Sequence, residues 1–321
     1  MLHHPLLEGG DRLYFLNDVE RKTLLGRILP TARKVGVSEE LRGWNWSSPP
    51  LKPLYSDEGI SNYLISSQYC PTARDVFVAK VRGIRGEGNV HVTTGTLVHK
   101  AVSTVVLSYV EEGKEPDFEE WWKGETSSFE SLNDKQNAAQ TTQAELRRFI
   151  KSVWMQTNSD CQGALLARRS AQPYATEHDV RASALPFLVE HKVDGTLLGL
   201  SGLLSVDCFD YLHGIIFDLK YLRPTSITEP WRRLYCAGYA IALESIYEIP
   251  IDVGCVVYIS IVNGQLRVLR DIFFIGDDVR GWWLEERDKK LEIIAQKKDP
   301  GLPKKCYDAC LYLNYCLGDQ R

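Results

Sequence analysis

Two aspartates and a lysine lie within one short stretch of the sequence, and side chains of these types can hold a divalent cation. Asp218 and Lys220 are separated by a single residue, and Asp207 precedes them in the same stretch. Two carboxylates that approach each other closely repel, and burial makes the repulsion worse. A hard cation such as Mg²⁺ or Mn²⁺, which prefers carboxylate oxygens, relieves it. The alternative is a surface hairpin whose acids are solvated.

A β-hairpin over 201–221 would bring these three side chains together. Apolar residues lead into both aspartates, and Tyr211–Gly214 is the expected turn, with glycine supplying any positive φ that the reversal needs. A turn centred in the middle of that tetrapeptide sets Asp207 directly opposite Asp218, where Cβ atoms lie about 4.5–5.5 Å apart. Because side chains alternate along a strand, Asp218 and Lys220 share one face.

The cysteines near the end of the sequence form a second group with metal-binding chemistry. Cys306, Cys310 and Cys316 follow one another at spacings of four and six residues. Thiolates at such spacings hold zinc or an iron–sulfur cluster, and four ligands are normally needed. Cys70, which precedes Pro71, is our choice for the fourth ligand and would staple the early part of the chain to the late part. The alternatives are structural zinc at this site and, for Cys70, a lone buried thiol.

Composition limits the class of protein. The 321 residues are 44% hydrophobic, and the formal charge of −4 excludes a uniformly basic nucleic-acid coat but allows a local basic groove. Met1–Pro5 does not resemble a signal peptide, and the apolar run Val253–Val262 is too short for a membrane span of about 20 residues. We therefore expect a cytoplasmic protein with no membrane partner. In that compartment eight cysteines indicate metal binding rather than a disulfide framework.

Apolar periodicity predicts helices before the hairpin and further strands on both sides of it. The helical segments are 12–35, 59–79, a helix that begins at 93–96, 117–170, 228–246 and 277–297. The strand segments outside the hairpin are 178–182, 185–193, 196–200, 251–262 and 265–275. Asn263-Gly264, between the last two strands, is a strong hairpin signal. This succession predicts an α/β core with a mixed sheet.

The pattern divides the chain into five parts. They are an N-terminal extension, a part with the first cysteine ligand and a histidine-bearing helix, a helical insertion or lid, a core, and a cysteine-rich tail. Their bounds are 1–57, 58–116, 117–174, 175–300 and 301–321. The histidine is His99, and taken alone it is most simply a structural residue.

These pieces, in this order, resemble the CRISPR-associated RecB-like exonucleases that carry an iron–sulfur cluster. More narrowly, the chain looks like the longer variant found in archaeal type I-A adaptation modules. The resemblance spans roughly 58–317. The matching parts are Tyr69-Cys70-Pro71, Gly95–His99, Gly202–Asp207, Asp218–Lys220, the tyrosines at 235 and 239, and the final three cysteines.

The resemblance implies a PD-(D/E)xK core, a restriction-endonuclease-like mixed sheet flanked by helices. His99, Asp207 and Asp218 would bind Mg²⁺ or Mn²⁺, with the backbone carbonyl of Leu219 as a further ligand. Lys220 would orient or activate the attacking water and stabilise the charge that develops on the phosphate. This is metal-assisted hydrolysis.

Two tyrosines of the 228–246 helix also have counterparts in the family. Tyr239 corresponds to the tyrosine of the family's Q-x-x-x-Y motif and would position DNA or Lys220. Tyr235 stands where that motif has glutamine, which is a departure from the pattern.

The resemblance further implies an iron–sulfur cluster, [4Fe–4S] rather than [2Fe–2S], held by Cys70, Cys306, Cys310 and Cys316. This four-cysteine cluster would join the N-terminal and C-terminal parts of the chain. The first gap between the tail cysteines is one residue longer than in the usual pattern, which bears on the cluster type.

For this family the substrate is DNA, typically its single-stranded ends. The implied role is to trim spacer precursors alongside the integrase proteins of the CRISPR adaptation complex. A single strand would be held by a basic groove with stacking aromatic side chains. The candidate side chains, most of which would equally suit a solvated surface, are Arg74, Arg82, Arg85 and Arg232, together with Lys80, Arg223 and Arg233.

Two further functions remain open at this point. The chain could be a non-catalytic iron–sulfur subunit of the spacer-acquisition complex, or a DNA-binding protein stapled by zinc. The intact set of His99, Asp207, Asp218 and Lys220 favours the nuclease, because a binding module needs none of these residues.

Overall fold

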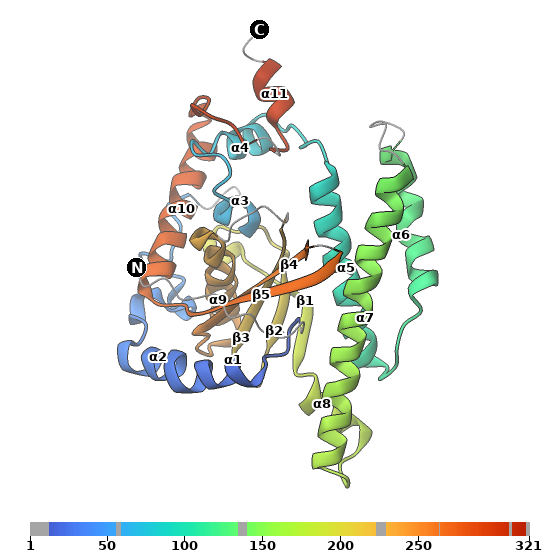
Figure 1. Cartoon of the computed structure of the whole chain (residues 1–321). Coiled ribbons are helices and arrows are strands. Elements are labelled where there is room, and N and C mark those ends of the chain that lie inside the picture. The colour runs from blue at the N-terminus through green and yellow to red at the C-terminus, as the bar shows by residue number, and fades with distance from the viewer. Residues whose placement is uncertain are drawn as a thin grey trace.

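The centre of the molecule is one five-stranded sheet, seen in Figure 1 in a computed structural model that describes residues 13–55, 59–133, 140–222, 229–262, 264–307 and 310–318. The strand order is β1-β2-β3-β4-β5. Strands β3 and β4 are parallel, and the other three neighbouring pairs are antiparallel. Parallel neighbours need a crossover connection, which helix α9 (Arg233–Tyr247) supplies. The strands are β1 Phe187–Val193, β2 Leu204–Asp210, β3 Ile215–Tyr221, β4 Val253–Val262 and β5 Gln265–Phe274.

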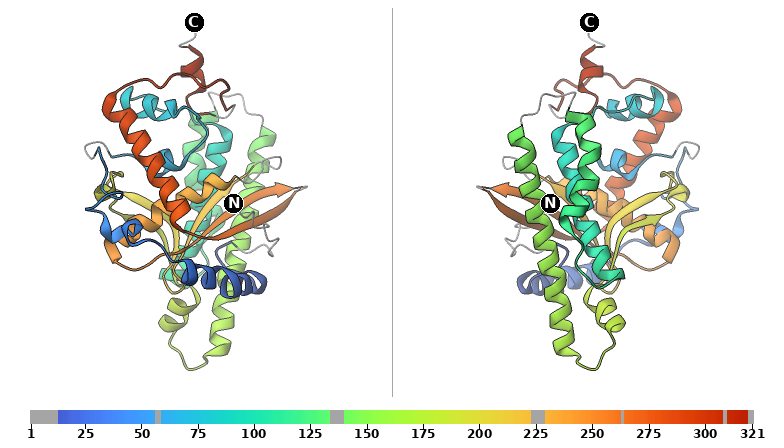
Figure 2. Two further views of the ribbon diagram at one scale, coloured as in Figure 1. Left: turned by 90° about the vertical axis from the view of Figure 1, so that its left-hand side faces the viewer. Right: turned by 90° about the vertical axis from the view of Figure 1, so that its right-hand side faces the viewer.

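Helices cover both faces of this sheet, and each face has its own hydrophobic core. One core contains buried residues of α5, α7 and α8, and the other contains buried residues of α3, α9 and α10. Figure 2 shows α10 on one side of the sheet, and α5 with α7 on the other. No helix in these described ranges is long and apolar enough to cross a membrane. The remaining bounds are α1 Asp18–Thr23, α2 Leu29–Val35, α3 Asn62–Ser66, α4 Arg74–Val76, α5 Val90–Glu111, α6 Phe118–Asn133, α7 Gln140–Ala171, α8 Glu177–Ala184, α10 Asp277–Gln296 and α11 Leu313–Gly318.

The described part of the N-terminal extension is packed into the rest of the fold. The carboxylate of Glu20 forms a fully buried ion pair with Arg270 of β5 at 2.6 Å. Further on, Glu244 of α9 accepts hydrogen bonds from Arg42 at 2.8 Å and from the backbone N–H of Gly43 at 2.9 Å. A Cβ on Gly43 would lie 2.1 Å from a backbone oxygen of α9, so only glycine fits there. This segment therefore helps to hold α9 in place.

The predicted hairpin is confirmed. Strands β2 and β3 are antiparallel, and Gly214 of the turn has a φ of 63°. The register pairs Cys208 with Phe217. Continued by one residue, it sets Asp207 opposite Asp218, as the sequence predicted.

Several predicted elements are wrong or differ in their bounds. Residues 178–182 form part of helix α8 instead of a strand, because Thr176 caps the helix by accepting a hydrogen bond from the N–H of Asp179, and acidic residues occupy its first turn. Residues 196–200 form a 3₁₀ turn over Thr196–Leu198. Residues 59–79 are divided among α3, α4 and a π-helical turn over Phe77–Val81. Asn263 of the predicted turn lies outside the described residues.

Candidate active site

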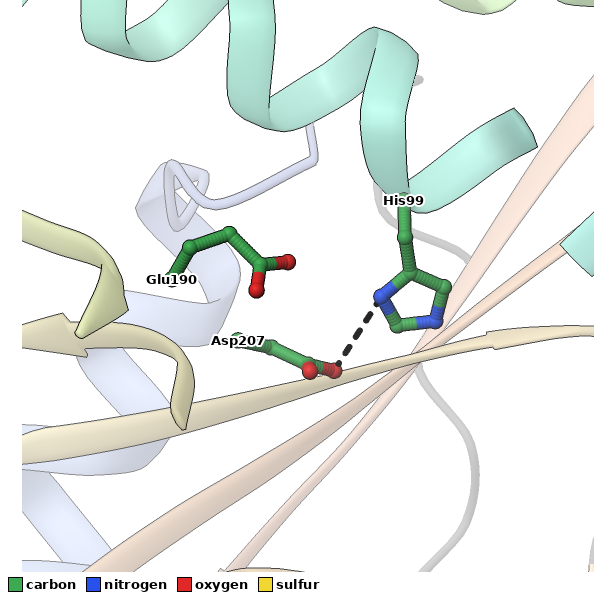
Figure 3. A group of neighbouring side chains, drawn as sticks. All are labelled: His99, Glu190 and Asp207. Atoms are coloured by element: carbon green, nitrogen blue, oxygen red, sulfur yellow. Dashed lines mark ion pairs between the residues drawn. The ribbon is translucent and has the colours of Figure 1, made fainter. Parts of the chain in front are cut away.

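The long helix α5 brings His99 against the sheet. Asn89 caps the helix by accepting a hydrogen bond from the N–H of Val92, and the apolar side chains of α5, including Val98 and Val102, are buried in the core on that face. His99 directly follows Val98, and Figure 3 shows its ring pointing towards Asp207 of β2. Its Nδ1 lies 3.5 Å from Asp207 Oδ2. The structure thus brings together two predicted metal ligands that are far apart in the sequence.

A third residue, the acidic Glu190 of β1, lies beside His99 and Asp207 (Figure 3). One ligand atom from each of His99, Glu190 and Asp207 lies within 4.8 Å of the other two. We refer to these three residues as the carboxylate–histidine group. Sequence reasoning missed Glu190, although an acid in the middle of the strand Phe187–Val193, next to the strand of Asp207, is a usable signal.

The backbone of β1 is distorted at Glu190, and the distortion sets the position of the group. Glu190 has a φ of 49°, in the left-handed region that is unusual for residues other than glycine. Val189 packs in the core under α5, whereas Val193 packs in the core under α9. In a regular strand these two side chains would share a face. Such a conformation costs about 1–3 kcal/mol, and strain of this kind is often found at functional sites.

The Asp218–Lys220 pair lies beside this group on β3. Lys220 Nζ donates a hydrogen bond to Asp218 Oδ1 at 2.8 Å, so the two side chains share a face as the sequence predicted. Asp207 Oδ2 accepts a hydrogen bond from the backbone N–H of Leu219 at 2.9 Å. The ligand atoms of Asp218 fall outside the tight carboxylate–histidine group, and its Oδ1 accepts the hydrogen bond from Lys220.

Asp218 is fully buried, and one of its oxygens is unsatisfied. Its Oδ2 has no hydrogen-bond partner among the described residues. Burial raises the pKa of this carboxyl from 3.8 to about 6; the Lys220 ammonium opposes the rise, and Asp207 adds to it. A buried anionic oxygen without a partner is costly, and a nearby cation would offset that cost. Together with the oxygen and nitrogen donors of the carboxylate–histidine group, this orphan oxygen fits a hard divalent cation.

The raised pKa of Asp218 predicts a specific pH dependence of stability. The folded chain holds this proton more tightly than the unfolded chain, so the free energy of unfolding of the metal-free protein falls as pH rises from about 4 to about 6. Asp218→Asn removes the titrating group, so the stability of the variant relative to the parent should rise across this window. Urea unfolding of chelator-treated proteins between pH 4.5 and 7.5 measures the difference. Parallel pH profiles of the parent and the variant would contradict the assignment.

The carboxylate–histidine group opens on a cavity of about 740 Å³. Lys100, Lys220 and Arg232 supply positive charge to its wall, and Asp75 adds a carboxyl group. Seven tyrosines also line the cavity: Tyr63, Tyr69, Tyr221, Tyr235, Tyr239, Tyr307 and Tyr312. Burial raises the pKa of the Tyr239 phenol well above its usual range, against a hydrogen bond to Asn62 that lowers it. The cavity therefore combines a candidate cation site with a neutral, aromatic and partly basic lining.

The four predicted cluster cysteines line one smaller hollow, which we call the cysteine hollow. Its residues come from the segment that leads into α4, from α4 itself and from the tail, and Figure 1 shows α11 beside α4. Hydrogen bonds join earlier segments to the tail: Thr72 Oγ1 donates to the carbonyl of Gly301 at 2.8 Å, and the N–H of Glu87, in the loop before α5, donates to the carbonyl of Leu311 at 2.8 Å. Within the described part of the chain, no three of these thiols lie within 4.8 Å of one another.

The predicted DNA-binding arginines occupy three different environments. Arg74 is 6% exposed, and its guanidinium binds both oxygens of Asp299, so its position is that of a scaffold residue at the cysteine hollow. Arg82 and Arg85 are exposed on the loop before α5. Arg232 lines the cavity and donates a hydrogen bond to the Tyr69 hydroxyl at 3.1 Å.

The three further basic candidates also separate. Arg233 is bound to both carboxylate oxygens of Asp271. Lys80 donates a hydrogen bond to the backbone carbonyl of Gly59. Arg223 lies outside the described residues.

The fold and side chains define an α/β protein with a candidate cation site at the edge of a tyrosine-lined cavity. Comparison with known proteins identifies the family. The profile of the family described as "CRISPR-associated exonuclease Csa1" matches residues 13–319, which includes most of the N-terminal extension. The chain belongs to this family of CRISPR-associated exonucleases and is an enzyme of the exonuclease class.

Two curated relatives carry the same description. One, from Saccharolobus solfataricus, is 33% identical over 282 residues, which cover 87% of this chain and 92% of the relative. The other, from Thermoproteus tenax, is 27% identical over 301 residues, which cover 93% of this chain and 98% of the relative. Both are similar to this chain over almost their whole length.

Proposed function

We propose that this chain is a DNA exonuclease of the PD-(D/E)xK type that depends on Mg²⁺ or Mn²⁺. It trims single-stranded ends of spacer precursors during CRISPR adaptation, alongside the integrase proteins. The observation that carries the proposal is the convergence of His99, Glu190 and Asp207 beside the buried Asp218–Lys220 pair. The family to which the chain belongs supports the CRISPR-associated exonuclease role.

Each residue of the site has a distinct part in phosphodiester hydrolysis. A divalent cation held by His99, Glu190 and Asp207 would polarise a phosphoryl oxygen and lower the pKa of the attacking water. Asp218 holds the Lys220 ammonium at 2.8 Å and keeps it directed along one face of β3. From there Lys220 can donate a hydrogen bond to the phosphate and stabilise its developing charge.

The cavity suits an unpaired strand. Aromatic faces stack on nucleobases with little sequence preference, and cationic side chains hold the phosphates of single strands. The tyrosine lining supplies the faces, and Lys220 and Arg232 supply the charge. The overall charge of −4 makes such a local arrangement more important, since the protein has no general attraction for DNA.

We further propose that the cysteine hollow binds an iron–sulfur cluster, [4Fe–4S] rather than zinc. A tetrahedral zinc site has Zn–S distances of about 2.3 Å and therefore S–S separations of about 3.8 Å. Among the described residues, no three thiol sulfurs of the hollow lie within 4.8 Å of one another, so their spacing is wider than a zinc site needs. A multinuclear cluster has room for that spread.

Digestion of end-labelled DNA tests the proposed function. The cluster-loaded protein is purified anaerobically and incubated with linear single strands, blunt duplexes and circular single strands. We expect removal of nucleotides from linear single-stranded ends with Mg²⁺ or Mn²⁺, and at least a hundredfold slower cleavage with EDTA. Cleavage of circles at the same rate, or metal-independent cleavage, would contradict the proposal.

A further inference from the structure

The ammonium group of Lys220 has two partners of different kinds. Its Nζ donates a hydrogen bond to Asp218 Oδ1 at 2.8 Å and lies 3.9 Å from the ring centroid of Tyr235. The second distance is well within the limit of about 6 Å at which the negative face of an aromatic ring attracts a cation. The Lys220 side chain is 18% exposed, so water screens this attraction only in part.

The ring of Tyr235 is held firmly in its position on α9. The residue is 3% exposed, and its backbone carbonyl accepts a hydrogen bond from Asn62 Nδ2 at 3.0 Å. Its ring centroid lies 6.3 Å from that of Tyr63 and 6.3 Å from that of Trp231. Burial raises the pKa of the phenol well above its usual value, so a neutral ring faces the ammonium.

We infer that Tyr235 is a positioning residue that holds the Lys220 ammonium against its ring face, ready to bind the scissile phosphate. The inference rests on the proposed function of the site. It assigns a role to Tyr235, which stands where the Q-x-x-x-Y motif has glutamine.

The two side-chain types would hold the ammonium differently. A glutamine carbonyl would accept one of the three N–H groups of lysine. The ring face attracts the whole charge without fixing one N–H direction. With one N–H given to Asp218, more donors then remain for phosphate oxygens.

A series of ring substitutions tests this role directly. Tyr235 is replaced with Phe, with mono-, di- and trifluorinated Phe, and with Leu. Phe keeps the ring face, and we expect its kcat to remain within about threefold of the parent. Each fluorine withdraws electron density from the face, so kcat should fall stepwise, and Leu should lower kcat about 10- to 30-fold. The effect should appear in kcat, with a smaller change in KM for the single strand. A flat fluorine series would overturn the inference.

A second measurement does not depend on catalysis. In protein labelled with ¹³Cε-lysine, the Cε protons of Lys220 should be shifted upfield by the ring current, and Lys220→Arg identifies the signal. The shift should persist in Tyr235→Phe and disappear in Tyr235→Leu, without DNA or metal. An unshifted signal in the parent overturns the inference. A shifted signal in a protein that cleaves no DNA would instead count against the proposed function alone.

Discussion

Asp207→Asn is expected to lower kcat/KM for single-stranded DNA by about 10³-fold or more. Asp207 has three different neighbours in the site: its Oδ2 lies 3.5 Å from His99 Nδ1, accepts the N–H of Leu219, and belongs to the group with Glu190. Asparagine has the same shape and can still accept the backbone hydrogen bond, so the fold should be retained while the negative charge is lost. Initial rates on end-labelled substrate measure the effect, and a loss of less than tenfold would contradict the assigned site.

Asp210 on the same strand provides the matched control. It accepts hydrogen bonds from the backbone N–H groups of Leu212 and His213 and pairs with the His213 ring, all within the hairpin turn. Asp210→Asn should therefore reduce stability but leave kcat unchanged in the folded protein.

Glu190→Gln tests whether Glu190 is a metal ligand. If it is, the variant should need at least tenfold more Mn²⁺ than the parent to reach half of its maximal rate.

Cys316→Ser is expected to remove visible absorption near 400 nm and to lower the melting temperature of the cluster-loaded protein by about 5–10 °C. The cysteine hollow joins the start of α4 to the tail, so a bound cluster contributes to the stability of that junction. Tyr307, Cys310 and Tyr312 also line the large cavity, so KM for single strands should rise when the junction loosens. Absorption spectra, iron and zinc analysis and thermal unfolding measure these effects.

Cys161 separates loss of a ligand from loss of a buried thiol. It is fully buried in α7, away from the hollow, and burial raises the pKa of its thiol. Cys161→Ala should cost about 1 kcal/mol of stability through a small cavity and keep the absorption and the iron. A colourless, zinc-containing parent protein would contradict the iron–sulfur proposal, and unchanged spectra in Cys316→Ser would remove Cys316 from the ligand set.

The hairpin shows how far the sequence alone can specify part of an active site. Asp207, Asp218 and Lys220 are joined by strands of regular alternation and by a turn that ends in glycine, so register and face follow from local rules. The mixed sheet and its crossover helix could also be predicted, because apolar periodicity differs between strands and helices. The prediction of a strand over 178–182 is wrong, because an alternating pattern of only five residues does not distinguish a strand from a capped helix.

By itself, the sequence determined which residue types could bind a cation, where the hairpin turns, and which cysteines have ligand spacing. Only the tertiary structure decided that Glu190 joins His99 and Asp207, that Arg74 pairs with Asp299, and that Tyr235 faces the Lys220 ammonium. The reason is physical. Local periodicity sets the direction of side chains within one element, whereas these contacts depend on a distorted strand and on how α5 and α9 pack against opposite faces of the sheet.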